Sequence, residues 1–223
     1  MVGAGLAATV LAGPVRAQTA EVDLALALAI DCSFSVDASE FRLQMRGLGE
    51  AIASDEVWQA IEKGPLQRVA MTVYQWSDKD FQRVTEPWAV IDSRAAAQGF
   101  GTRVARGARR IPEGGTAISS ALIFGAALFE VAPPATRRVI DIATDGRNNM
   151  GGHETVARDT VVARGITINA LAISNEVPTL DAYLELRVAG GPSNFVERAP
   201  SYDDFAAAML RKIVKEVTGP GLT

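Results

Sequence analysis

The sequence has little of the two residue types on which many enzyme and metal sites depend. Its 223 residues include one cysteine, Cys32, and one histidine, His153. A single cysteine excludes an internal disulfide and excludes zinc or iron–sulfur sites built on several thiolates. With one histidine and no Gly-x-Ser-x-Gly motif, the chain also lacks the usual residues of a serine hydrolase. We expect Cys32 to be a buried structural thiol and His153 to lie at the surface near a helix start.

The chain has no excess of basic residues. It carries 22 Lys and Arg against 26 Asp and Glu, a formal net charge of −4, and its arginines are scattered along the sequence. Domains that bind nucleic acid usually concentrate positive charge on one face. Nucleic acid is therefore not an expected partner.

The sequence also lacks an apolar run long enough to cross a membrane. Residues 2–12 are apolar and small, but Gly, Pro and Arg follow before the run reaches the about 18 residues that a spanning helix needs. Val15 and Ala17 place small residues at the two positions that a signal peptidase reads. We therefore predict a signal peptide at 1–17, one domain at 18–223, no transmembrane segment, and export to the periplasm or medium of a bacterial cell.

The most distinctive stretch is the apolar run LALALAI at residues 24–30. In an extended strand its leucines and Ile30 fall on one face and its three alanines on the other, so both faces are apolar. This pattern is typical of a central strand in a parallel sheet that helices cover on both sides. We interpret it as the first central strand.

Strands and helices alternate through the rest of the chain. Apolar spacing predicts helices at 38–53, 93–109, 117–131, 154–164, 179–188 and 203–217, and strands at 67–76, 83–91, 138–144, 166–173 and 194–197. The short turn before 83–91 allows only an antiparallel hairpin, and Pro87 places this strand at a sheet edge. The helix at 117–131 is apolar nearly all round, so we expect it to be buried. The predicted class is α/β, a doubly wound, mostly parallel sheet with one antiparallel edge strand and helices on both faces.

Side chains that carry oxygen follow three of these segments. Asp31, Ser33 and Ser35 come directly after the first strand, Thr116 follows a Gly-Gly pair at the head of a helix, and Asp145 ends a central strand. Because parallel strands present their carboxyl ends at one edge of a sheet, we expect these side chains to lie close together. Carboxylate and hydroxyl oxygens suit a hard cation. Each segment alone has a simpler explanation, since Ser and Asp after a strand often cap the next helix.

The order of these motifs resembles that of the von Willebrand factor type A domain over essentially the whole mature chain. The motifs are Asp-x-Ser-x-Ser, then Gly-Gly-Thr before an apolar helix, then a strand that ends in Asp-Gly. Within that superfamily the tract RRVID at 137–141, with Asp145-Gly146 and Asn148-Asn149, is similar to an uncharacterised bacterial family of exported proteins. The resemblance implies the Rossmann-like fold of these domains.

The resemblance also implies a metal-ion-dependent adhesion site (MIDAS). Ser33, Ser35 and Thr116 would offer hydroxyls to Mg²⁺ or Mn²⁺, and Asp31 and Asp145 would bind directly or through water. Neutral hydroxyls leave part of the charge of the ion uncompensated, so that Asp or Glu of a protein partner completes the coordination shell. The implied function is metal-dependent protein binding without catalysis.

Two other interpretations stay open. A metal-dependent hydrolase or phosphatase would use the same site, although an aspartate-based phosphatase needs a second carboxylate where Ser33 stands. A structural domain with a vestigial site is the other alternative, but all five ligand positions are present. Asn148 and Asn149 could line the metal site or simply form a turn, and Phe34 need not touch a ligand.

Asp141 falls in the middle of the predicted strand at 138–144, where a lone carboxylate is costly to bury. We expect it to be paired with the amide of Asn169 or with an arginine from a helix. Asn169 is favoured because strands joined by one crossover helix are usually neighbours. The alternative is that Asp141 faces a buried water.

Overall fold

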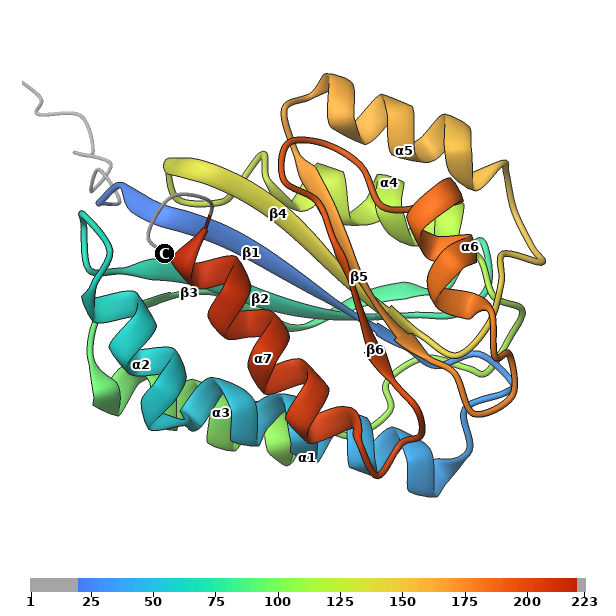
Figure 1. Ribbon diagram of the computed structural model, residues 1–223, viewed down its shortest axis with the longest axis horizontal. Coiled ribbons are helices and arrows are strands. Elements are labelled where there is room, and N and C mark those ends of the chain that lie inside the picture. The colour runs from blue at the N-terminus through green and yellow to red at the C-terminus, as the bar shows by residue number, and fades with distance from the viewer. Residues whose placement is uncertain (1–19, 220–223) are drawn as a thin grey trace, which may run out of the picture.

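The computed structural model describes residues 20–219, and its six strands form one sheet (Figure 1). The predicted signal peptide at 1–17 lies outside the described residues. The strands are β1 (Val22–Asp31), β2 (Val69–Trp76), β3 (Gln82–Ile91), β4 (Ala135–Thr144), β5 (Thr167–Ile173) and β6 (Val196–Ala199). Their order is β3-β2-β1-β4-β5-β6, and only β3 runs antiparallel to its neighbour. The predicted α/β class with one antiparallel edge strand is confirmed.

Helices cover both faces of the sheet, as the doubly wound prediction requires (Figure 1). One face carries α1 (Ala38–Ala53), α2 (Asp55–Glu62), α3 (Arg94–Ala105) and α7 (Phe205–Thr218), and the other carries α4 (Ile118–Leu128), α5 (Glu154–Ala163) and α6 (Leu180–Arg187). Each predicted helix and strand is present. None of the helices within residues 20–219 has the length and apolar character needed to cross a membrane.

Strand β1 lies at the centre of the sheet and separates two hydrophobic cores. Leu24, Leu26 and Leu28 pack in the core beneath α1, α2, α3 and α7, whereas Ala25 and Ala27 pack in the core beneath α4, α5 and α6. All of these side chains are buried. Because side chains alternate along an extended strand, the leucines of β1 face one helical layer and its alanines face the other.

Strand β3 lies at one side of the sheet and pairs only with β2, with which it forms a hairpin. Pro87 lies in this edge strand, as predicted. Proline has no backbone N–H to donate, and an edge strand has a neighbour on one side only, so the missing donor is tolerated there. The pairing shifts register between Met71 and Val73, and there the Thr72 hydroxyl donates to the Glu86 carbonyl at 2.7 Å. A side chain thus replaces part of the backbone ladder where the hairpin is irregular.

Two helical segments differ from the sequence expectations. Helix α2 was not predicted because its eight residues give too short a periodic pattern; the Ser54 hydroxyl caps it by accepting the Val57 N–H at 3.2 Å. The helix predicted at 93–109 ends at Ala105. After that point the Gln75 side chain binds the backbone, donating to the Ala108 carbonyl and accepting the Arg110 N–H.

Helix α4 is less buried than its apolar composition predicts. Ile118 and Leu122 lie in the core, but Ile123 is 45% exposed and Phe124 is half-buried. In a three-layer fold, only the side of a helix that faces the sheet is fully covered. The expectation of a helix buried all round is therefore wrong for this outer side.

The predicted partner of Asp141 is also wrong. Asp141 and Asn169 are register partners on β4 and β5, as expected, but the Asp141 carboxylate lies 2.7 Å from the ammonium of Lys212 on α7. Lys212 also donates to Glu216 at 2.6 Å, and the Asn169 amide donates to that same Glu216 oxygen at 2.9 Å. Side chains of register partners on neighbouring strands lie side by side on the same face of the sheet. Asp141 and Asn169 therefore both face α7, and Lys212 of that helix supplies the counter-charge.

Candidate metal centre

The loop after β1 brings three of the predicted ligands together at the carboxyl edge of the sheet. Asp31 is the last residue of β1, and its Oδ1 accepts the backbone N–H of Ser33 at 2.7 Å. The hydroxyls of Ser33 and Ser35 are 3.1 Å apart. Asp31 and Ser33 are buried, while Ser35 is half-buried. The tight turn after the strand therefore gathers one carboxylate and two hydroxyls.

Asp145 joins this group from the end of β4, the strand next to β1. Its Oδ1 accepts the Ser35 hydroxyl at 2.6 Å, and its Oδ2 accepts the Tyr202 hydroxyl at 2.8 Å. Asp145 is buried. Burial and the negative charge of Asp145 raise the pKa of the Tyr202 phenol far above its ordinary value, so Tyr202 is a donor at neutral pH.

Thr116 is held at the same edge by two neighbouring segments. The segment before it crosses the end of β2, where the Ser77 hydroxyl donates to the Pro112 carbonyl at 2.9 Å. The Thr116 N–H donates to Asn149 Oδ1 at 2.7 Å, and the Asn149 N–H donates back to the Thr116 carbonyl at 3.0 Å. A Cβ on Gly146, directly after Asp145, would lie 3.3 Å from the Thr116 hydroxyl oxygen. Thr116 is thus placed beside the loop that begins with Asp145.

Each oxygen of the two carboxylates accepts one hydrogen bond, which fixes how both groups are oriented. For Asp31, Oδ2 accepts the Thr144 hydroxyl at 2.6 Å, while Oδ1 accepts the Ser33 N–H. Burial, and then the negative charge of Asp145, raise the pKa of Asp31 to about 7. The two acids therefore repel each other at the edge where the hydroxyls gather.

This donor set fits a hard divalent cation. It consists of two carboxylates and three hydroxyls, and no group of three or more His, Cys, Asp or Glu side chains that could hold a metal occurs among residues 20–219. Cys32 lies between the ligand candidates but is buried, its thiol approaches the Ile30 carbonyl at 3.9 Å, and burial raises its pKa above the ordinary range. A protonated, inward-facing thiol does not supply a soft ligand. Oxygen-only coordination suits Mg²⁺ or Mn²⁺.

Two residues of the site, Thr144 and Tyr202, were not predicted from the sequence, and they bind the two carboxylates. Asn149, for which the sequence left open a place at the metal site or in a turn, holds Thr116. Thr144 directly precedes Asp145 at the end of β4, so its position alone could have indicated that its hydroxyl lies near the site. Tyr202 lies 57 positions after Asp145 in a loop after β6, and nothing in its local sequence marks it.

Solved structures with low sequence identity share the fold. Proximal thread matrix protein 1 from the mussel byssus, in a structure with a zinc-occupied MIDAS motif, matches with a TM-score of 0.67 and 17% identity over 91% of this chain and 50% of that chain. The pilus adhesin SpaC from Lactobacillus rhamnosus GG gives a TM-score of 0.60 and 14% identity over 88% and 31% of the two chains. A von Willebrand factor type A protein from Catenulispora acidiphila matches with a TM-score of 0.56 and 20% identity over 88% of this chain and 43% of that chain. The chain thus spans half or less of each of these proteins.

These matches confirm the fold that the order of the motifs suggested, a von Willebrand factor type A-like domain. No curated protein matches the sequence. The family described as Protein of unknown function (DUF1194) matches residues 21–221, which is nearly the whole described chain. The chain therefore belongs to the DUF1194 family.

Proposed function

We propose that the protein is a metal-dependent binding module that holds Mg²⁺ or Mn²⁺ with Asp31, Ser33, Ser35, Thr116 and Asp145. The observation that carries the proposal is the burial of Asp31 and Asp145 without a cationic partner. None of the ion pairs among residues 20–219 includes either carboxylate. Two buried, unneutralised acids are costly, and a divalent cation removes that cost.

The partner that suits such a site is a protein carrying an exposed Asp or Glu. Mg²⁺ prefers six oxygen ligands and keeps several waters, so a site built largely from hydroxyls leaves positions open. A carboxylate from outside completes the shell and adds charge attraction. Phe34, between Ser33 and Ser35, is 73% exposed and offers an apolar contact at the rim.

Binding is favoured over hydrolysis because the one histidine of the chain, the residue type that most often acts as a general base, is not among the proposed ligands. His153 is exposed at the start of α5 and makes no side-chain hydrogen bond that caps the helix. The similarity in fold to a byssus matrix protein and a pilus adhesin agrees with a binding role.

A thermal-shift titration tests the proposal. Mg²⁺ at a hundred times its dissociation constant should stabilise the fold by about 2.7 kcal/mol if it binds only the native state. Asp145→Asn should abolish the shift, whereas Asp203→Asn, which changes an exposed acid outside the site, should keep it. No shift in the wild-type protein with Mg²⁺ or Mn²⁺ would contradict the proposal. Metal-dependent turnover of generic ester or phosphate substrates, lost in Asp31→Ala, would identify an enzyme instead.

We further propose that the protein acts outside the cytoplasm after removal of residues 1–17. The apolar run and the small residues at Val15 and Ala17 support this. N-terminal sequencing of the exported protein should begin at Gln18, and a protein retained inside the cell with an intact N-terminus would contradict export.

A further inference from the structure

Arginines that are scattered in the sequence gather around two adjoining grooves in the structure. The first groove, of about 580 Å³, lies between the start of α1 and the segment at 105–113, and the second, of about 610 Å³, lies between that segment and β3. The arginines that line these two arginine grooves are Arg42, Arg46, Arg83, Arg106, Arg109 and Arg110, and Arg109 lines both. Glu113 is the one acid among the described residues that line them. Positive charge is thus concentrated here in a chain whose net charge is −4.

Four of these arginines are exposed and have no ion-pair partner. None of the ion pairs among residues 20–219 includes Arg42, Arg83, Arg106 or Arg110. The other two are paired, Arg46 with Glu50 at 2.7 Å and Arg109 with Glu113 at 2.6 Å. Each groove therefore contains two guanidinium groups that are free to bind an anion.

Asp37, directly before α1, does not supply the missing counter-charge. Its Oδ1 caps the helix by accepting the N–H of Ser39 at 2.6 Å and that of Glu40 at 2.8 Å. These hydrogen bonds lower the pKa of Asp37 most, and the charges of Arg42 and Arg109 lower it further. The carboxylate lies near Arg42 but is bound to the start of the helix, which leaves Arg42 without a hydrogen-bonded acid of its own.

The segment between the two grooves is already fixed by contacts on both sides. The Gln75 side chain of β2 donates to the Ala108 carbonyl at 2.8 Å and accepts the Arg110 N–H at 2.7 Å. On the other side, the Arg109 guanidinium donates to the Val36 carbonyl at 2.6 Å and lies 5.2 Å from the centre of the Phe41 ring. A ligand would therefore have to order exposed arginine side chains but not the backbone that carries them, which lowers the entropy cost of binding.

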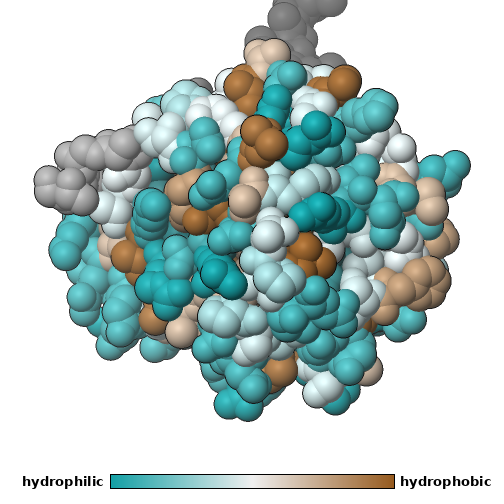
Figure 2. All heavy atoms as spheres, turned by 45° about the vertical axis from the view of Figure 1, so that its right-hand side comes forward, coloured by the Kyte–Doolittle hydropathy of each residue, from teal (hydrophilic) through white to brown (hydrophobic). Residues whose placement is uncertain are grey.

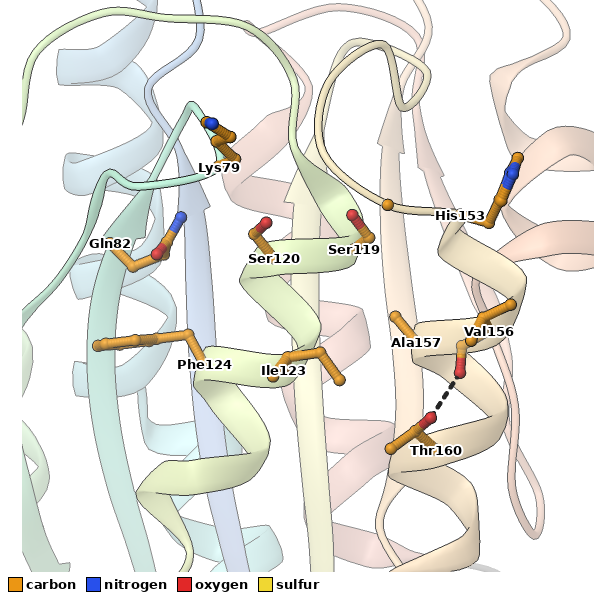
Figure 3. A pocket seen from close by; sticks show the side chains of 11 residues that line it. Lys79, Gln82, Ser119, Ser120, Ile123, Phe124, His153, Val156, Ala157 and Thr160 are labelled. Atoms are coloured by element: carbon orange, nitrogen blue, oxygen red, sulfur yellow. Dashed lines mark hydrogen bonds between the residues drawn. The ribbon is translucent and has the colours of Figure 1, made fainter.

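The groove between α4 and α5 lacks this concentration of free charge (Figure 3). Lys79 is the one Lys or Arg among the described residues that line it, and its ammonium lies 3.8 Å from the Asp80 carboxylate. Its lower part is apolar, with Ile123 on α4 and Val156 on α5 (Figure 3). Charge therefore distinguishes the arginine grooves from this one.

The surroundings of the arginine grooves do not suit nucleic acid or a membrane. Single strands of nucleic acid stack their bases on exposed aromatic rings, but Phe41, which lines the first groove, is only 4% exposed. Membrane-surface helices insert exposed apolar side chains, and none of the large exposed apolar residues of the described chain lines either groove. On the face that comes forward in Figure 2, apolar groups likewise lie apart between hydrophilic ones. A concave, cationic surface favours a ligand whose acidic groups project on side chains.

We propose that the two arginine grooves bind an extended acidic segment of a protein partner. Its Asp and Glu carboxylates pair with Arg42 and Arg106 in the first groove and with Arg83 and Arg110 in the second. A guanidinium group can bind a carboxylate through two parallel N–H···O hydrogen bonds, which makes this contact stronger and more directional than attraction between point charges. The binding needs no metal, so the inference does not depend on the proposed metal site.

Fluorescence anisotropy with a labelled peptide of twelve glutamates tests the inference in metal-free buffer of low ionic strength. The wild type should bind the peptide, and about 0.5 M salt should weaken binding about tenfold or more because exposed charges are screened. Arg106→Glu in the first groove and Arg110→Glu in the second should each weaken binding about tenfold, because an attraction becomes a repulsion. Lys63→Glu is the matched control. It makes the same change of charge at an exposed residue at the end of α2, outside both grooves, and should leave binding unchanged.

Each other outcome would overturn the inference in a defined way. No binding by the wild type, or an equal loss in Lys63→Glu, would mean that the grooves have no specific affinity for acidic peptide. A loss in Arg106→Glu but not in Arg110→Glu would confine the ligand to the first groove. Tighter binding of a heparin oligosaccharide, a thymidine oligonucleotide or phosphatidylserine vesicles, weakened by the same two variants, would assign the grooves to that class of ligand instead. The thermal shift with Mg²⁺ tests the metal site separately, because no metal is present in these measurements.

Discussion

Lys212 Nζ lies 2.7 Å from Asp141 Oδ1, and both side chains are buried between α7 and the sheet. The same ammonium donates to Glu216, which also accepts the Asn169 amide of β5. One lysine thus lies between two carboxylates, and α7 is joined to β4 by an ion pair and to β5 by a hydrogen bond, as well as by its apolar face. The cluster holds one more acid than base, so removal of Lys212 would leave two buried carboxylates without a counter-charge.

The first prediction concerns the coupling of this ion pair. Lys212→Met should lower the free energy of unfolding by about 3–5 kcal/mol, because it leaves the buried carboxylates of Asp141 and Glu216 without a counter-charge. In urea unfolding, the double variant Asp141→Asn with Lys212→Met should lose less stability than the sum of the two single variants. The exposed pair Arg46–Glu50, at 2.7 Å, is the control and should show a coupling of about 0.5 kcal/mol or less. Additive losses for the buried pair would show that it does not interact.

The second prediction concerns pH. Burial, and then the charge of Asp141, raise the pKa of Glu216 to about 7. Between the ordinary pKa of Glu and about 7, the native state binds more protons than the unfolded state, so stability should fall as pH rises and level off above about 7. The loss attributable to Glu216 should be about 1–3 kcal/mol. Denaturant unfolding of wild type and Glu216→Gln from pH 5 to pH 8 measures it. Parallel pH profiles for the two proteins would refute the assignment.

A third prediction links protons to metal binding. The pKa of Asp31 is about 7 in the metal-free protein, because of burial first and of Asp145 second. A cation binds the ionised carboxylate, so protonation of Asp31 competes with metal binding as the pH falls below 7. Metal titration should give an apparent Mg²⁺ affinity about tenfold weaker at pH 6 than at pH 8. Equal affinities at the two pH values would mean that Asp31 does not contribute its charge to the site.

The fourth prediction tests Tyr202, which orients Asp145 through a 2.8 Å hydrogen bond. Tyr202→Phe removes only the hydroxyl, and loss of such support around a metal ligand typically weakens binding about 10–100-fold. Metal titration should show a decrease of at least about tenfold. Tyr74→Phe is the matched control, because the buried Tyr74 hydroxyl donates to the Ala121 carbonyl in the other core. An equal loss in both variants would indicate a general effect on the fold.

The sequence predicted the sheet well because its signals are local. The alternation of Leu and Ala in β1 requires apolar surroundings on both faces, and Pro87 requires an edge. The Asp31, Ser33 and Ser35 cluster could be placed with Asp145 because parallel strands end at a common edge. These inferences need no knowledge of distant contacts.

The features that were missed depend on contacts between distant segments. Lys212 lies 71 positions from Asp141 and stands on the apolar side of a helix, where its long side chain turns inward to the carboxylate. The half-covered state of α4 depends on how far α5 reaches beside it, which the composition of α4 does not encode. Tyr202 likewise meets Asp145 only because β6 carries the chain back to the metal edge.

The most direct test of the central claim is the amount of metal bound to the protein. Equilibrium dialysis against millimolar Mn²⁺, followed by elemental analysis, should find one ion per chain in the wild type and in Asp203→Ala. Asp145→Ala should bind none. Metal absent from the wild type, or retained equally in Asp145→Ala, would contradict a metal site built on Asp31, Ser33, Ser35, Thr116 and Asp145.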